Sequence, residues 1–195
     1  MLQRYSENIE NIAGCDEAGR GCLCGPVVAA AVILPQEFFH KDLDDSKKIS
    51  QKTRDTLKPI IEKESIDFSV AFVKPKEIDK LNILKSSILA MHRALDALDI
   101  KPSLILVDGN RFDRYKKIKH KTVVKGDSKY LSIAAASILA KTHRDEYMMK
   151  IHREFPHYGW DKSKGYPTRK HREAILKYGF TKYHRKSFQV NISLF

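Results

Sequence analysis

Apolar residues occur along the chain in short runs that predict buried strands. NIAGC at residues 11–15 is followed by GPVVAAAVIL at residues 25–34, a continuous apolar run typical of a strand covered on both faces. Residues 66–73 alternate so that four large apolar side chains share one face, which predicts another strand. The last two strands are predicted in SLILVDGN at residues 103–110 and in KTVVKGD at residues 121–127.

Elsewhere the apolar residues recur at three- and four-residue steps, as they do on one face of a helix. This spacing predicts a helix over residues 50–64, interrupted by Pro59, and one long amphipathic helix over residues 76–98. A second long helix is predicted over residues 130–155, where alanines permit close packing on a sheet. A shorter helix is predicted over residues 168–178.

The order of these elements predicts an α/β fold, with a mixed sheet flanked by helices and a small C-terminal helical segment. With 195 residues the chain has the length of a single domain. We expect residues 1–155 to form the core. Residues 156–195 are expected to form a helical and loop extension that packs on this core and borders the functional site.

Composition narrows the class of protein. Apolar residues make up 42% of the chain and charged residues 31%, a balance typical of globular proteins rather than of disordered or membrane-spanning ones. The N-terminal MLQRYSENIE carries charges where a signal peptide needs an apolar segment. We therefore expect a cytoplasmic protein, with a monomer as the default state.

The net charge of +12 indicates a polyanionic partner, most simply nucleic acid, although a solvated basic surface would also account for the charge. Lysine and arginine become denser after residue 110, in RFDRYKKIKHK, KSKGYPTRKHR and KYHRKSF, and are interleaved there with tyrosine or phenylalanine. This mixture can hold phosphates and pack on sugars or bases, which favours the nucleic-acid interpretation.

Acidic residues follow several of the predicted strands. Asp16 and Glu17 follow NIAGC, Asp108 closes SLILV, and Asp127 follows TVV through KGD. Each aspartate alone is more simply a turn cap, but open α/β sheets bind ligands at the carboxyl ends of their strands, and neighbouring ends lie about 5 Å apart. Acids so placed suit a pair of Mg²⁺ ions, which about 4 Å apart activate a water and stabilise the leaving oxygen of a phosphoryl displacement.

Separate blocks of the sequence resemble, in order and spacing, the bacterial ribonuclease HII family, the type 2 ribonucleases H. The blocks are GCDEAGRG, DDSKKIS, VDGN, VVKGDSKYLSIAAASILAKTHRD and KGYPT, and the resemblance covers residues 12–189. It implies a ribonuclease H-like sheet and an endonuclease that uses Mg²⁺ or Mn²⁺ in a two-metal mechanism. Its implied substrates are RNA–DNA hybrids and DNA duplexes with embedded ribonucleotides, cut on the 5′ side of the ribonucleotide to remove misincorporated ribonucleotides and RNA primers.

The resemblance also implies roles for particular residues. The family's acidic quartet, which holds the metal and performs the chemistry, falls on Asp16, Glu17, Asp108 and Asp127. Its glycine-arginine-glycine motif, whose backbone is expected to read the ribose 2′-hydroxyl, falls on Gly19, Arg20 and Gly21. This is reasonable physically, because only that hydroxyl separates RNA from DNA locally and glycine lets main-chain donors approach a sugar closely.

Further substrate contacts follow from the same resemblance. The family's tyrosine, expected to stack on the deoxyribose after the ribonucleotide and so to reject continuous RNA, is Tyr166. Lys47 and Lys48 resemble the phosphate-contacting block, and Lys164 is a weaker candidate.

The sequence departs from the family at a few positions. Cys22 stands where bacterial members often have proline, and Cys15 and Cys24 replace small aliphatic residues. The cysteines lack the paired spacing of a zinc site, so we expect buried, inert thiols. Asp44 stands where asparagine is expected and would slightly weaken nearby phosphate binding.

Other polar residues have simpler interpretations. We expect polar contacts on a helix surface from His143, Arg144 and Asp145, with a direct role of Asp145 as the less favoured alternative. The scattered histidines His157, His171 and His184 are expected to be solvated or to face phosphates.

The residues leave three functions open. A ribonucleotide-specific endonuclease explains the acids, the charge and the glycine loop together. A junction resolvase or transposase-type nuclease would need no reader of the 2′-hydroxyl and would cut all-DNA substrates, and a non-catalytic RNA–DNA binding module would leave the acids unexplained. The expected partners are RNA–DNA hybrids and ribonucleotide-containing duplex DNA, and no membrane is expected. The C-terminal SFQVNISLF gives a faint indication that the chain docks to a sliding clamp.

Overall fold

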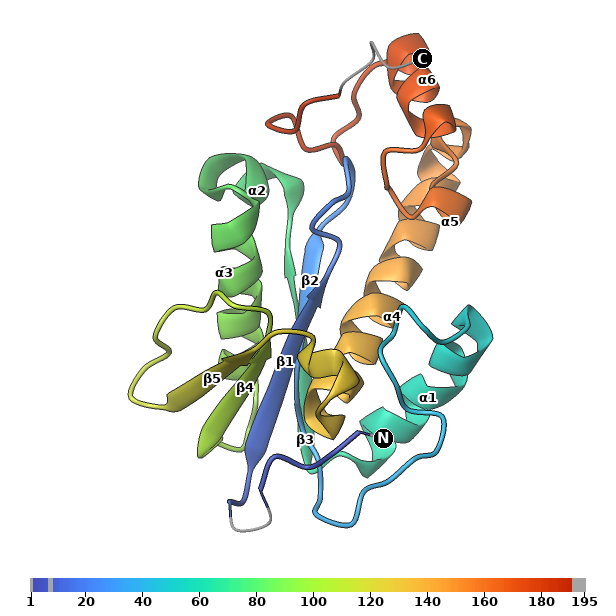
Figure 1. The fold of residues 1–195 in the computed structure, drawn as a ribbon. Coiled ribbons are helices and arrows are strands. Elements are labelled where there is room, and N and C mark those ends of the chain that lie inside the picture. Colours follow the sequence, from blue (N-terminus) through green and yellow to red (C-terminus); the bar gives the residue numbers. More distant parts are fainter. Residues whose placement is uncertain (1, 7–8, 191–195) are drawn as a thin grey trace.

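The computed structural model describes residues 2–6 and 9–190, which form a mixed sheet between two layers of helices (Figure 1). The strands are β1 Ile12–Ala18, β2 Val27–Ile33, β3 Asp67–Val73, β4 Leu104–Asp108 and β5 Lys119–Val123. They lie in the order β3-β2-β1-β4-β5. β2 pairs antiparallel with both β1 and β3, whereas β4 runs parallel to β1 and to β5. The predicted mixed sheet flanked by helices is confirmed.

Helices cover both faces of this sheet. They are α1 Gln51–Glu64, α2 Pro75–Leu81, α3 Ile83–Asp96, α4 Leu131–Glu154, α5 Trp160–Ser163 and α6 Arg169–Tyr178, with short turns η1 Gly126–Ser128 and η2 Pro156–Tyr158 on either side of α4. α3 packs on one face, and α4 packs on the other with α1 beside it (Figure 1). Among the described residues, no helix is both long and apolar enough to cross a lipid bilayer.

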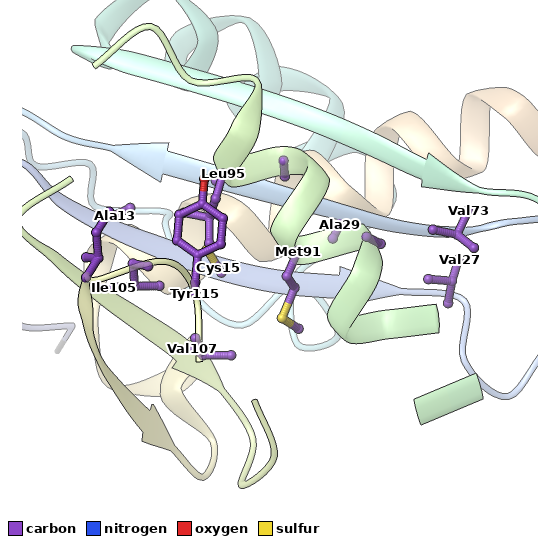
Figure 2. Close-up of a cluster of buried hydrophobic side chains, with 14 of the residues drawn as sticks. Ala13, Cys15, Val27, Ala29, Val73, Met91, Leu95, Ile105, Val107 and Tyr115 are labelled. Carbon is purple, nitrogen blue, oxygen red and sulfur yellow. The ribbon is translucent and has the colours of Figure 1, made fainter. Parts of the chain in front are cut away.

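Apolar side chains fill the space on each side of the sheet. β2 is buried along its whole length, because alternate residues such as Ala29 and Ala30 face the α3 layer and the α4 layer in turn. Figure 2 shows the α3 side, where Cys15 of β1 and Val107 of β4 lie in one cluster with Met91 of α3. Burial on both sides fixes β1, which carries Asp16 and Glu17, and β4, which ends at Asp108.

Two helical regions differ from the sequence-based predictions. The single helix predicted over residues 76–98 is divided into α2 and α3 at Asn82, whose φ of 72° is left-handed and whose side chain caps α3 by accepting from the Lys85 amide. α1, in contrast, continues through Pro59 despite the predicted interruption. Pro59 and Asp55 are both exposed, so the Asp55 carbonyl that loses its helical partner can be solvated.

Gly14 lets α4 approach β1 closely. A Cβ at this position would lie 2.2 Å from the carbonyl carbon of Ser132 and 2.4 Å from the amide nitrogen of Ile133, both in the first turn of α4. No side chain fits in that space, because both obstacles are backbone atoms of a packed helix. The close contact brings η1 and the start of α4 next to β1, and η1 carries Asp127.

Candidate active site

Three carboxylates from different elements converge beside β1. Asp16 belongs to β1, Asp108 is the last residue of β4, and Asp127 lies in η1 just before α4. One oxygen atom from each of the three lies within 4.8 Å of the other two. Backbone amides orient two of them: Glu17 donates to Asp16 Oδ1 and Gly126 donates to Asp108 Oδ1, each at 2.7 Å.

Asp16 and Asp127 lie in a poorly solvated space, which favours the protonated forms of these two acids. Asp16 is 4% exposed and Asp127 is 3% exposed. Burial raises the pKa of Asp16 well above its ordinary value, and the charges of Glu17 and Asp108 raise it further. Burial, followed by the charge of Asp108, also raises the pKa of Asp127. A cation bound among the three would relieve this repulsion.

The donor atoms fit a hard divalent cation. All three grouped ligands are carboxylate oxygens, the donors that Mg²⁺ and Mn²⁺ prefer. Cys15, Cys22 and Cys24 are buried free thiols, and burial raises the pKa of each, so none is poised to act as a thiolate ligand. The prediction of buried thiols is confirmed.

The loop before α1 brings two lysines to the acids. Lys47 Nζ lies 3.5 Å from Asp127 Oδ2, and Lys48 Nζ lies 3.1 Å from Ser128 Oγ. Both lysines are exposed, so their ammonium groups are also open to a phosphate. Asp44 Oδ1 lies 3.4 Å from Lys48 Nζ and would compete with a phosphate for that lysine.

The predicted glycine-arginine-glycine motif forms the turn that follows β1. Gly19 has a φ of 94°, a left-handed conformation that strongly favours glycine. Arg20 is exposed, and its Nη1 lies 3.1 Å from Glu17 Oε1. Glu17 is therefore paired with Arg20 here and lies outside the group of three carboxylates, although burial raises its pKa as well.

Tyr166 faces this turn from the C-terminal segment. A Cβ on Gly21 would lie 3.8 Å from Cε1 of the Tyr166 ring, and Tyr166 is 45% exposed. The turn and the ring therefore border the same open surface. Lys164 is only 9% exposed, and its Nζ lies 3.2 Å from Met149 Sδ, so its side chain is directed to α4.

His171 and His184 are buried, and the prediction that they are solvated or phosphate-facing is wrong. His171 Nδ1 donates to the Tyr166 carbonyl at 2.9 Å, and its Nε2 accepts from Trp160 Nε1 at 2.9 Å. His184 Nε2 donates to the same His171 Nε2 at 3.2 Å, and its Nδ1 accepts from the Thr181 amide at 2.9 Å. Every ring nitrogen thus has a partner when both rings are neutral, and the chain of bonds anchors the backbone of Tyr166.

Acidification is expected to destabilise the protein through His184. Burial, with the nearby His171, lowers the pKa of His184 from 6.5 to about 4. The unfolded chain therefore takes up the proton first. The contribution of His184 to the free energy of unfolding is complete above pH 6.5 and is lost as the pH falls towards 4, with about 2 kcal/mol lost at pH 5.

A His184→Gln variant isolates this effect, because glutamine keeps an amide donor towards His171 and does not titrate. Its melting temperature should fall less than that of wild type between about pH 7 and about pH 5. Equal falls in the two proteins would show that His184 is not the group responsible.

Arg144 and Asp145 were predicted on a helix surface, and this is wrong because both are buried. Arg144 is 1% exposed, and its guanidinium donates to the carbonyls of Cys24, Pro26 and Lys164 at 2.9–3.1 Å. The periodicity of α4 could not show this, because its C-terminal half is covered by the segment after Phe155. Asp145 is 8% exposed and pairs with the neighbouring Lys141 at 2.7 Å.

The predictions for the other two histidines agree with the structure. His143 contacts Glu62 at 2.9 Å on the surface of α4, and His157 is exposed.

Two buried serines near the acids were not identified from the sequence. Ser137 of α4 hydrogen-bonds the Asp16 carboxylate, which lowers the pKa of Asp16 against the larger effect of burial. Its Oγ also lies 2.8 Å from Oγ of Ser46, which belongs to the same loop as Lys47. Ser46 and Ser137 therefore tie the lysine loop to the acids. A serine in an alanine-rich helix gives no signal that would have distinguished it.

The sequence and the fold match proteins of one family. The profile of the family described as "Ribonuclease HII" matches residues 13–191. A curated relative named "Ribonuclease HII" from Christiangramia forsetii is 63% identical over 190 residues, which cover 97% of this chain and 96% of the relative.

Solved structures agree with this result. The ribonuclease H2 from Pyrococcus horikoshii OT3 has a TM-score of 0.78 and 28% identity, covering 92% of this chain and 94% of that chain. The ribonuclease HII of Archaeoglobus fulgidus, solved as a complex with PCNA, has a TM-score of 0.75 and 27% identity, covering 91% of this chain and 95% of that chain.

Proposed function

Because this chain belongs to the ribonuclease HII family and is therefore a ribonuclease H endonuclease, we propose that it cuts the phosphodiester on the 5′ side of a ribonucleotide. The ribonucleotide would lie in an RNA–DNA hybrid or in a DNA duplex. The observation that carries this proposal is the grouping of Asp16, Asp108 and Asp127 within 4.8 Å, close to the glycine turn that follows β1. The consequence would be removal of misincorporated ribonucleotides and RNA primers.

Asp16, Asp108 and Asp127 would hold Mg²⁺ or Mn²⁺, with Glu17 as the fourth acid of the set. When bound, a pair of such ions polarises the phosphodiester and activates a water for in-line displacement. The amides of Glu17 and Gly126 hold the carboxylates of Asp16 and Asp108 in place, so these two acids need little reorganisation to act as ligands.

The surface beside the acids would recognise the substrate. Backbone amides of Gly19, Arg20 and Gly21 would donate to the ribose 2′-hydroxyl, and the exposed ring of Tyr166 would stack on the next deoxyribose. The exposed ammonium groups of Lys47 and Lys48 would contact phosphates. Lys164 remains the weaker candidate for such a contact, because only 9% of it is exposed.

A cleavage assay tests this function. The substrates are a DNA duplex with a single ribonucleotide, the same duplex without it and an RNA–DNA hybrid, each with Mg²⁺, with Mn²⁺ and with EDTA. We expect a cut on the 5′ side of the ribonucleotide only with metal, and no cut in plain DNA. Cutting of plain DNA would instead support a resolvase or transposase-type nuclease, and binding without cutting would support a non-catalytic module.

Gly21→Ala is expected to fold like wild type and to cut poorly. The new methyl group would meet the Tyr166 ring at an ordinary contact distance of 3.8 Å, so the melting temperature should change little. The same methyl group would separate a sugar from the backbone amides, and we expect kcat/KM to fall about a hundredfold, chiefly through KM. Thermal melting and steady-state kinetics check this, and an unchanged kcat/KM would contradict the role of the turn.

We also propose that residues 1–155 act as the core and residues 156–195 as an extension that borders the site. The contact of Trp160 and Ile175 with Met148 of α4 supports this division.

We further propose that this chain binds a sliding clamp, which the archaeal relative solved with PCNA supports. The C-terminal SFQVNISLF remains the candidate segment, and its residues 191–195 lie outside the described part of the chain. A cytoplasmic monomer stays our expectation.

A further inference from the structure

Arg185 is a buried charge that the proposed chemistry does not use. It is 0% exposed, and its guanidinium donates to three backbone carbonyls of the β1–β2 connection. Nη2 donates to Gly19 at 2.7 Å, Nη1 to Arg20 at 2.9 Å and Nε to Gly25 at 2.9 Å. Burial lowers the pKa of Arg185 to about 10, so the side chain stays charged at neutral pH.

The backbone around Arg185 is held on both sides. Its own amide donates to the Leu23 carbonyl at 2.9 Å, and the amides of Lys186 and Ser187 donate to the Asp79 carboxylate at 3.1 and 2.9 Å. In Figure 1 the C-terminal loop, coloured red, lies over the end of the β1–β2 hairpin, coloured blue. The guanidinium is therefore a fixed fork of donors rather than a mobile side chain.

The carbonyls held by Arg185 determine where two amides point. In a trans peptide the carbonyl and the following amide point in opposite directions, and the described chain has no cis peptide bonds. The carbonyls of Gly19 and Arg20 point to Arg185, so the amides of Arg20 and Gly21 point away from it. These two amides belong to the turn to which the proposed function assigns recognition of the ribose.

We propose that Arg185 is a positioning residue for ribose recognition: by holding the carbonyls of Gly19 and Arg20, it directs the amides of Arg20 and Gly21 towards the 2′-hydroxyl. The proposal rests on the proposed function of the turn and adds the group that orients it. Donors fixed before the substrate arrives lose no conformational freedom on binding, which favours a ribose over a deoxyribose.

Arg144 is the matched control. It is as buried as Arg185 and also donates to three backbone carbonyls, which belong to Cys24, Pro26 and Lys164. Its guanidinium lies against Gly19 but bonds neither the Gly19 nor the Arg20 carbonyl. Arg144→Lys and Arg185→Lys therefore remove similar numbers of buried hydrogen bonds, and only Arg185→Lys releases the two carbonyls that orient the turn.

The test compares binding to two duplexes that differ in one hydroxyl group. Wild type, Arg185→Lys and Arg144→Lys are titrated in EDTA, which prevents cutting, with a DNA duplex carrying one ribonucleotide and with the same duplex in all-DNA form. The measured quantity is the ratio of the two Kd values. We expect Arg185→Lys to lower the ribose preference at least about tenfold with the all-DNA Kd unchanged, and Arg144→Lys to keep most of the preference.

The other outcomes overturn the proposal. A full ribose preference in Arg185→Lys would show that the turn is oriented without this side chain, and equal losses in both variants would reduce Arg185 to a structural role. A wild type without ribose preference would remove the basis of the inference, whereas the proposed function fails separately, in the cleavage assay. If Arg185→Lys shows no cooperative melting and has therefore not folded, the same ratio of Kd values is measured for Arg185→Gln, whose side chain keeps two N–H donors.

Discussion

Asp108→Asn should abolish cleavage while leaving the metal-free protein at least as stable as wild type. Asparagine keeps an oxygen that can accept from the Gly126 amide, so the backbone contact at 2.7 Å is preserved. It removes a charge that raises the pKa of both Asp16 and Asp127, so repulsion within the cluster falls. Loss of a metal ligand costs several kcal/mol of transition-state stabilisation, which corresponds to a roughly thousandfold or greater fall in rate.

The measurements are melting in EDTA and single-turnover cleavage of a duplex with one ribonucleotide. A melting temperature clearly below that of wild type would assign Asp108 a structural role. Cleavage within tenfold of wild type, which corresponds to about 1.4 kcal/mol, would remove Asp108 from the metal site.

Gly14→Ala should have the largest effect on stability. The new methyl group would overlap backbone atoms of Ser132 and Ile133 at 2.2–2.4 Å. Movement of β1 would disturb the cluster on the α3 side, and movement of α4 would disturb the cluster on its own side of the sheet. We expect a loss of about 3 kcal/mol or more in the free energy of unfolding. For a chain of this length that lowers the melting temperature by about 10 °C.

Gly21→Ala is the control for this change, because the same added methyl group meets nothing closer than 3.8 Å. Its melting temperature should stay near that of wild type. The pair therefore separates a glycine that packs against a helix from one that we propose to face the substrate. Equal melting temperatures for Gly14→Ala and wild type would contradict the close contact between β1 and α4.

The sheet and the acids could be predicted because their signals are local. The continuous apolar run of β2 indicated burial on both faces, and Asp16, Asp108 and Asp127 each stood next to a strand signal. The resemblance to ribonuclease HII then supplied the roles that we propose for the glycine turn and for Tyr166. The break at Asn82 could not be predicted, because the apolar spacing continues from α2 into α3. A single residue with positive φ divides the two helices.

The residues that hold the site together could not be predicted, because their partners are distant in the sequence. Arg185 binds carbonyls 165 and 166 residues earlier, and Arg144 binds carbonyls 118 and 120 residues earlier. Such arginines resemble ordinary surface charges in a chain with 36 lysines and arginines. The prediction for His171 and His184 was wrong for a different reason. Their partners lie only 3 to 13 residues away in the sequence, but only the fold of the C-terminal segment buries the rings against Trp160 and the Tyr166 carbonyl.

The most direct test of the central claim, that Asp16, Asp108 and Asp127 hold the metal used for cutting, is Mn²⁺ binding followed by electron paramagnetic resonance without nucleic acid. We predict that wild type binds Mn²⁺ and that Asp108→Asn binds it at least about tenfold more weakly. Equal affinity of the two proteins for Mn²⁺ would contradict the claim and place the metal elsewhere.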